Sequence, residues 1–172
     1  MTRHILLVGL PGSGKSSIGV RAAELLGTRC VDIDGAIVRR MQMPIERIFG
    51  ERGEAGFREL EREAVAEALG EPPAVIVPGG GWAAQPGTME QARARAFLIY
   101  VKAPVADAAV RTQAGADRPL LAGPDPIARM RALLEQREAR YLMADTEVRN
   151  DEGMVEEAAG QVVELARRYA GW

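Results

Sequence analysis

The stretch 9-GLPGSGKSS-17 decides the fold, because its first eight residues match the pattern G-x-x-x-x-G-K-[ST]. The apolar run 5-ILLV-8 precedes it and predicts a buried parallel strand. Apolar residues then recur at helical spacing as far as Leu26, and Gly27 follows where a left-handed cap would end a helix. A strand, a glycine-rich turn and a helix in this order predict a loop that binds the phosphates of a nucleotide.

The loop carries the groups that phosphates require. Its glycines let the chain bend so that backbone N–H groups point at the phosphates, where the helix dipole is positive. Lys15 would reach the outer phosphates as a point charge, and the Ser16 hydroxyl would be a ligand of the Mg²⁺ that bridges them. The residues expected to bind the nucleotide are Gly12, Ser13, Gly14, Lys15, Ser16 and Ser17.

The rest of the chain predicts one domain of the α/β class. With 172 residues, of which 47% are hydrophobic, the chain can form one core and hardly two. Further apolar runs predict strands at 30–33, 74–77, 97–101 and 146–148. Helical patterns lie at 44–49, 55–69, 88–95, 105–111, 126–143 and 154–169. Because strands and helices alternate, we expect a parallel sheet covered on both faces, as a single domain over residues 1–172.

Charge and cysteine content exclude several classes of partner. The net charge is −2 and the charges are scattered, without the dense positive field that duplex nucleic acid requires, so no nucleic-acid partner is expected. Cys30 is the only cysteine, which excludes an internal disulfide and fits a reducing compartment. The apolar run near the N-terminus is too short for a signal peptide or a membrane span. We therefore expect a cytoplasmic protein without membrane contact.

The loop alone does not identify the phosphate acceptor, because kinases, GTPases and motor ATPases share it. The chain lacks the Asn-Lys-x-Asp motif of common GTPases, and the run 74–77 does not end in a Walker B aspartate. Asp32 and Asp34 instead flank Ile33 at the end of the second predicted strand, where i, i+2 spacing directs both side chains to one face. One carboxylate can organise Mg²⁺, and the other can accept a proton from an attacking hydroxyl. Two solvated acids at a strand end are the alternative.

Six segments occur in the order and spacing of shikimate kinases: 9-GLPGSGKS-16, Asp32-x-Asp34, Phe57-Arg58-x-x-Glu61, Gly79-Gly80-Gly81, Arg118-Pro-Leu-Leu and Arg137-x-x-x-Tyr141. The chain resembles this family from about residue 3 to about residue 148. The resemblance implies ATP-dependent phosphorylation of the 3-hydroxyl of shikimate by a monomer. It also implies a three-layer α/β/α P-loop kinase fold, with a five-stranded parallel sheet in the order 2-3-1-4-5.

The resemblance assigns roles in the acceptor site. Asp34 would contact the reacting hydroxyl as the base, while Asp32 would support the Mg²⁺ that Ser16 binds directly. Arg58 and Arg137 match the pair that binds the substrate carboxylate, a task suited to the guanidinium fork. A solvated surface arginine is the alternative for Arg58.

Two further features belong to this acceptor site. The glycines at 79, 80 and 81 would let backbone N–H groups approach the ring closely, although a simple turn would also explain them. Glu61 either orients Arg58 or forms an ordinary exposed ion pair with it. The segment expected to bind shikimate covers about 33–61.

A stretch rich in glycine and proline, about 112–125, is expected to be a mobile lid. In it, Arg118 resembles the arginine that neutralises charge on the transferring phosphoryl group, and it joins Lys15 and Asp34 in the catalytic set. Arg111 matches a position that packs against the adenine ring. The chain departs from the family at 148–153, which leaves the adenine contacts there open.

Two other functions stay open. A kinase for another small polyol acid, such as gluconate, would keep the loop but lack the paired arginines and the glycines at 79–81. A non-catalytic sensor of shikimate and nucleotide would have lost a catalytic group or gained a partner domain. Lys15, Asp34 and Arg118 are all present, which favours the enzyme.

Overall fold

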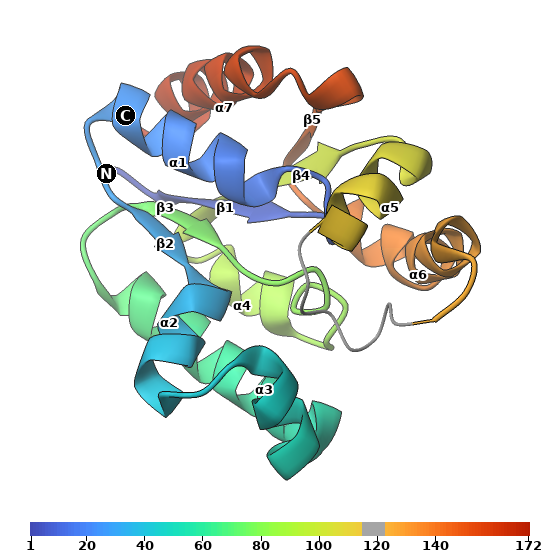
Figure 1. The fold of residues 1–172 in the computed structure, drawn as a ribbon. Helices are drawn as coiled ribbons and strands as arrows, with labels where there is room; N and C mark the ends of the chain where they lie inside the picture. Colours follow the sequence, from blue (N-terminus) through green and yellow to red (C-terminus); the bar gives the residue numbers. More distant parts are fainter. Residues whose placement is uncertain (115–122) are drawn as a thin grey trace.

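The computed structural model describes residues 1–114 and 123–172, and within them a five-stranded sheet runs in the order β2-β3-β1-β4-β5 (Figure 1). Every neighbouring pair of strands is parallel, which confirms the sheet type and the strand order that the resemblance implied. The strands are β1 (His4–Val8), β2 (Cys30–Asp32), β3 (Val75–Val77), β4 (Ala96–Lys102) and β5 (Thr146–Arg149).

Helices cover both faces of the sheet in the described part of the chain. They are α1 (Lys15–Leu26), α2 (Ile33–Met41), α3 (Ile45–Gly70), α4 (Thr88–Ala92), α5 (Val105–Ala114), α6 (Pro126–Tyr141), the short 3₁₀ helix η2 (Asp151–Gly153) and α7 (Val155–Tyr169). Helices α1 and α7 pack on one face, and helices α2 to α6 contribute to the core of the other (Figure 1). The predicted three-layer α/β/α architecture is therefore confirmed.

Strand β1 lies at the centre and divides its side chains between two cores. Ile5 and Leu7 pack with α1 and α7, while Leu6 and Val8 pack on the opposite face. All four side chains are buried. Burial on both faces explains why this strand reads as a continuous apolar run rather than as an alternating one.

The segment after β2 differs from the sequence prediction. The strand ends at Asp32, and Ile33 already begins α2, a helix that the apolar spacing did not reveal. Only Ile33 and Ile37 of this helix are buried, and two apolar positions are too few to reveal a helical period in the sequence. Asp34 therefore lies on a helix, and the argument from strand alternation that placed its side chain beside that of Asp32 was wrong.

Helix α3 joins the two helices predicted at 44–49 and 55–69. The join is Gly53, whose φ of 68° and ψ of 179° lie outside the helical region. Glycine adopts this conformation without the steric cost that a Cβ brings. The part of α3 after Gly53 carries Arg58 and Glu61.

Helix α5 extends to Ala114, so the first residues of the predicted lid are helical. Arg118 lies outside the described residues. Nowhere in residues 1–114 and 123–172 does a helix have the length and apolar character needed to cross a membrane.

The two ends of the chain meet at the edge of the sheet where β1 begins (Figure 1). The backbone N–H of Arg3 donates to the carbonyl of Ala170 at 2.8 Å. The indole Nε1 of Trp172 donates to the carbonyl of Arg3 at 3.0 Å.

Candidate active site

A cavity of about 210 Å³ opens at the carboxyl ends of β1, β2 and β3. This edge is where open parallel sheets bind ligands. The lining comes from the glycine loop, the β2–α2 junction, the segment after β3 and helix α5. Its residues are Gly12, Gly14, Lys15, Ser16, Ser17, Asp32, Asp34, Val77, Pro78, Gly79, Gly80 and Arg111.

The residues predicted to bind the nucleotide lie close together. Most of them line the cavity, and Ser13 is buried within the loop. Lys15 is only 6% exposed, and its Nζ donates to the carbonyls of Gly9 at 2.9 Å and Leu10 at 2.7 Å. The ammonium group of Lys15 is therefore held beside the first two residues of the glycine loop.

The loop packs tightly on helix α5. A Cβ at Gly12 would lie 2.2 Å from the carbonyl oxygen of Ala108, and its φ of 74° is left-handed. Both the space and the conformation therefore require glycine. Arg111, on the same helix, donates from Nη1 to the carbonyl of Gly12 at 3.2 Å. It lines the cavity, and its predicted packing against adenine remains a prediction.

Asp32 and Asp34 both line the cavity, although one ends a strand and the other begins a helix. A Cβ at Gly79 would lie 3.2 Å from Oδ1 of Asp34, so this carboxylate faces the segment after β3. The immediate turn from β2 into α2 brings the two acids together. Oxygen ligands from Asp32 and Ser16 in one cavity suit Mg²⁺, which binds few protein groups and keeps several waters.

Arg58 and Glu61 form a largely buried ion pair. Nη1 of Arg58 donates to Oε2 of Glu61 at 2.7 Å; the arginine side chain is 13% exposed and the glutamate is 0% exposed. Burial raises the pKa of Glu61, while the adjacent guanidinium of Arg58 lowers it. The pair is not the exposed contact that the alternative interpretation required, and Arg58 is not a solvated surface residue.

The glycines at 79–81 make room for these charged side chains. A Cβ at Gly79 would lie 2.5 Å from Oε1 of Glu61, and one at Gly81 would lie 2.2 Å from Nη2 of Arg58. Neither glycine has a left-handed φ, so space rather than conformation requires them. A side chain at Gly79 or Gly81 would collide first with the protein's own Glu61 or Arg58.

Arg137 approaches the same segment from helix α6. It is 8% exposed and lies beside Tyr141, whose hydroxyl donates to the carbonyl of Gly80 at 2.6 Å. Burial raises the pKa of Tyr141 to about 12, although the neighbouring Arg137 lowers it. Charges on Arg58 and Arg137 therefore both act on the surroundings of the 79–81 segment.

The family model for shikimate kinase matches residues 11–167, which include residues 11–17 of the loop, Asp32, Asp34, Arg58 and Arg137. The chain belongs to the shikimate kinase family. A relative named shikimate kinase from Mycobacterium avium (strain 104) is 43% identical over 146 residues, covering 85% of this chain and 82% of the relative. Another, from Halorhodospira halophila, is 38% identical over 162 residues, covering 94% and 92%.

Solved structures agree with this family. The shikimate kinase from Acinetobacter baumannii, in complex with shikimate, has a TM-score of 0.92 and 31% identity, covering 98% of this chain and 94% of that chain. A gluconokinase from Sinorhizobium meliloti 1021 has a TM-score of 0.63 and 19% identity, covering 99% and 94%. At that identity the gluconokinase shares the fold alone.

Within this member of the family, two polar residues near the site were missed by the sequence prediction. Gln85 donates from Nε2 to Oε2 of Glu61 at 3.3 Å and accepts from Nη1 of Arg62 at 2.6 Å. Asn150 is buried beside the glycine loop. The sequence gives no signal for Gln85. For Asn150, the signal is its position two residues after Val148, which predicts the same side of the extended chain that leaves β5.

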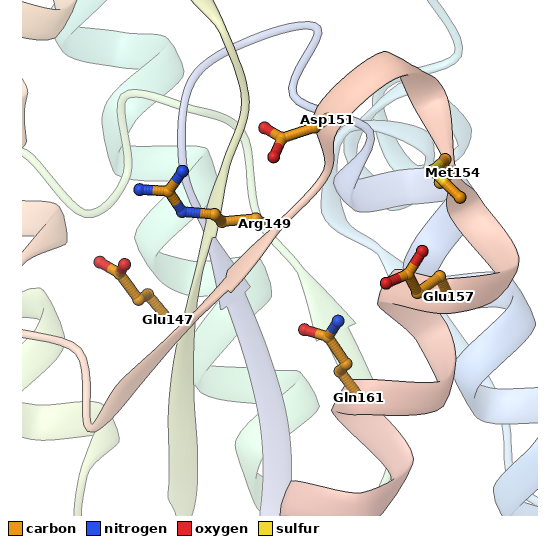
Figure 2. A pocket seen from close by; sticks show the side chains of 6 residues that line it. All are labelled: Glu147, Arg149, Asp151, Met154, Glu157 and Gln161. Atoms are coloured by element: carbon orange, nitrogen blue, oxygen red, sulfur yellow. The ribbon is translucent and has the colours of Figure 1, made fainter.

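A second hollow, of about 440 Å³, runs along β5 and the start of α7 (Figure 2). It is lined by Glu147, Arg149, Asp151, Met154, Glu157 and Gln161. All six are exposed, so none of these charges has been removed from water. Such side chains are typical of a solvated surface.

Proposed function

We propose that this chain transfers the γ-phosphoryl group of ATP to the 3-hydroxyl of shikimate. The observation that carries the proposal is the placing of two arginines at the 79–81 glycines, of which Gly79 and Gly80 line the phosphate-loop cavity. Arg58, whose side chain is 13% exposed, lies against Gly81, and the buried Arg137 lies beside Tyr141, which is hydrogen-bonded to Gly80. A substrate with one carboxylate and several ring hydroxyls needs guanidinium donors for the first and close polar contacts for the second.

In the proposed reaction, the 3-hydroxyl oxygen forms a bond to the γ-phosphorus and the bond to the bridging oxygen of ADP breaks. The hydroxyl proton passes to the carboxylate of Asp34, which lines the cavity. Lys15 neutralises charge on the outer phosphates, and Arg118 does the same on the transferring group. The binding of shikimate by the 33–61 segment and lid closure by 112–125 belong to the same proposal.

Mg²⁺ would neutralise charge on the β- and γ-phosphates. Ser16 and Asp32 would hold it, because their oxygens line the same cavity as Lys15. The nucleotide would contact Gly12, Ser13, Gly14, Lys15, Ser16 and Ser17, with Arg111 against the adenine.

A substrate panel tests this proposal. Shikimate, quinate and gluconate are each incubated with ATP and Mg²⁺, and ADP is measured by a coupled assay. We expect ADP to form with shikimate and at least a hundredfold less with gluconate. An NMR spectrum of the product then shows which hydroxyl was phosphorylated, because a phosphate on the 3-oxygen gives a scalar coupling between phosphorus and the ring proton at C3. Greater turnover of gluconate would overturn the proposed substrate, and shikimate binding without turnover would favour the sensor.

We also propose that the enzyme acts as a monomer in the cytoplasm. The expectation of a monomer follows from the resemblance to shikimate kinases. Burial raises the pKa of the Cys30 thiol to about 11, so this cysteine stays protonated and unreactive at neutral pH. Sedimentation at micromolar concentration tests the monomer, and a mass near 18.5 kDa is expected.

A further inference from the structure

Asn150 is a buried polar residue that the proposed chemistry does not use. It follows β5, where the side chains of Val148 and Asn150 are buried while those of Glu147 and Arg149 are exposed. The exposed side chains border the hollow in Figure 2. Alternation along the strand therefore turns Asn150 away from the hollow and toward the interior.

The side-chain amide of Asn150 is hydrogen-bonded to the glycine loop. Its Nδ2 donates to the carbonyl of Ser13 at 2.8 Å, and its backbone N–H donates to the carbonyl of Lys102 at 2.8 Å. The residue is 1% exposed. It therefore links the end of β4 directly to the turn that precedes α1.

Gly14 leaves the space that this amide occupies. A Cβ at Gly14 would lie 2.2 Å from Nδ2 of Asn150, and the φ of Gly14 is 95°. The contact also fixes the orientation of the amide, because the Ser13 carbonyl can only accept a hydrogen bond. Oδ1 of Asn150 is buried and has no hydrogen-bond partner within residues 1–114 and 123–172, so the contacts there use only the donor of this amide.

We propose that Asn150 is a positioning residue for the phosphate loop, acting on the Ser13–Gly14 peptide. In a planar trans peptide, the N–H of Gly14 points opposite to the carbonyl of Ser13. Because Asn150 holds that carbonyl, the N–H of Gly14 is directed away from Asn150, toward the cavity that Gly14 lines. The ligand for this N–H is a phosphate oxygen of a nucleoside di- or triphosphate. The inference rests on the nucleotide site of the proposed function.

Two substitutions test this role through ADP binding measured by calorimetry in the absence of shikimate. Asn150→Ala removes the donor, and Asn150→Asp keeps the shape but replaces the donor with an oxygen. We expect the Kd for ADP to rise about tenfold in Asn150→Ala and further in Asn150→Asp, because a polar group left unpaired in a buried site is costly. The Kd for shikimate should stay within twofold of the wild type.

The exposed Gln161→Glu variant is the matched control, because it makes the same amide-to-carboxylate change on α7 without touching the loop. Its Kd for ADP should stay within twofold of the wild type. In steady state, the loss in the Asn150 variants should appear in the KM for ATP more than in kcat. If both variants bound ADP within twofold of the wild type, or lost ADP and shikimate affinity equally, the positioning role would be overturned.

A measurement on the unaltered protein keeps the test valid if the variants do not fold. The side-chain amide protons of Asn150 give an NMR signal, and one of them is expected to be protected from exchange by the Ser13 carbonyl. Addition of ADP should shift this signal, and addition of shikimate alone should not. An exchange-labile signal that ADP leaves unchanged would overturn the inference. Because ADP is the probe, the result does not depend on whether shikimate is phosphorylated.

Discussion

Asp34 and Glu61 are two carboxylates that face the same glycine from different surroundings. A Cβ at Gly79 would lie 3.2 Å from an oxygen of Asp34 and 2.5 Å from an oxygen of Glu61. Glu61 is fully buried and paired with Arg58, whereas Asp34 lines the cavity. Two acids held in different environments can take different roles, so Asp34 suits proton transfer and Glu61 suits the orientation of an arginine.

The role of Asp34 predicts a selective loss of turnover. Asp34→Asn should lower kcat by about 10²- to 10⁴-fold, because the amide cannot accept the hydroxyl proton. The Kd for ADP should change by less than about threefold. Rapid-mix kinetics and calorimetry measure the two quantities, and an equal loss in both would indicate a structural role.

The role of Arg58 predicts a selective loss of acceptor binding. Arg58→Ala should raise the KM for shikimate by about ten- to a hundredfold, since a hydrogen bond to a charged group contributes about 1.5–3 kcal/mol. The KM for ATP should stay within about twofold. Arg47→Ala, which removes an exposed arginine of α3 paired with Glu51, is the control and should leave both constants unchanged. A collapse of ATP binding in Arg58→Ala would assign Arg58 to the scaffold.

The buried pair also predicts a dependence of stability on pH. Burial raises the pKa of Glu61 above its ordinary value of 4.5, and Arg58 opposes that shift. Removing Arg58 raises this pKa further, so the folded variant favours the protonated acid. The contribution of protonated Glu61 to the free energy of unfolding is then fully present below its ordinary pKa. It is lost as the pH rises through the raised pKa of the folded state.

Arg58→Ala should therefore lose more stability relative to the wild type at pH 8 than at pH 5. Urea unfolding at the two pH values measures the difference. The control makes Arg58→Ala in a Glu61→Gln background. There, the loss of unfolding free energy relative to Glu61→Gln alone should not depend on pH. A loss from Arg58→Ala that is the same at both pH values would contradict the assigned coupling.

At the scale of the element, helix α3 depends on one backbone conformation. Gly53 interrupts it with a φ of 68° and a ψ of 179°, and no more distant part of the described chain comes within 4 Å of the position of its Cβ. Gly53→Ala should cost about 1–3 kcal/mol of unfolding free energy through backbone strain alone. This corresponds to a decrease in Tm of about 2–4 °C per kcal/mol in a domain of this size.

Gly50→Ala is the matched control for Gly53→Ala. Gly50 lies in the same helix, has open space at its Cβ position and no left-handed φ. Alanine there should stabilise the protein by about 0.4–1 kcal/mol. Calorimetric melting of both variants measures the contrast, and equal effects would show that Gly53 is not under conformational constraint.

Elements with strong signals were predictable from the sequence. Strand β1, the glycine loop and α1 carry a continuous apolar run, a fixed glycine pattern and a helical period, and the structure confirms them. Helix α2 was missed because only two of its residues face the core. The closeness of Asp32 and Asp34 was expected for the wrong reason, since it comes from a strand-to-helix turn.

The residues of the proposed site were also predictable only in part. Motif spacing predicts Arg58 and Arg137 as site residues, but it could not tell that Arg58 is largely shielded from solvent, because the distant glycines at 79–81 make room for it. Asn150 could not be assigned to the loop from sequence, because 137 residues separate it from Ser13. Contacts of this kind depend on the order of strands in the sheet, which local patterns do not encode.

At the scale of the whole molecule, the proposed nucleotide site and the proposed shikimate site lie on different elements packed around one sheet. Each ligand should therefore stabilise the fold by binding the native state alone. A ligand at 100 times its Kd contributes about 2.7 kcal/mol, which predicts a rise in Tm of about 5–10 °C. Scanning calorimetry with ADP and with shikimate measures the two shifts.

Lys15→Met separates the two ligand effects, because it removes the charge at the mouth of the loop and keeps the apolar stem. The shift with ADP should fall by at least half, and the shift with shikimate should persist. Unchanged stabilisation by ADP would exclude Lys15 from the nucleotide site.

The meeting of the chain ends beside β1 has a practical consequence. Arg3 is hydrogen-bonded to Ala170 and Trp172, at the opposite end of the central strand from the glycine loop. A short peptide bridge between the ends would close the chain into a ring without approaching the cavity. New ends opened in the surface turn at 71–73 would then give a circular permutant that keeps Lys15, Asp34, Arg58 and Arg137 in their places.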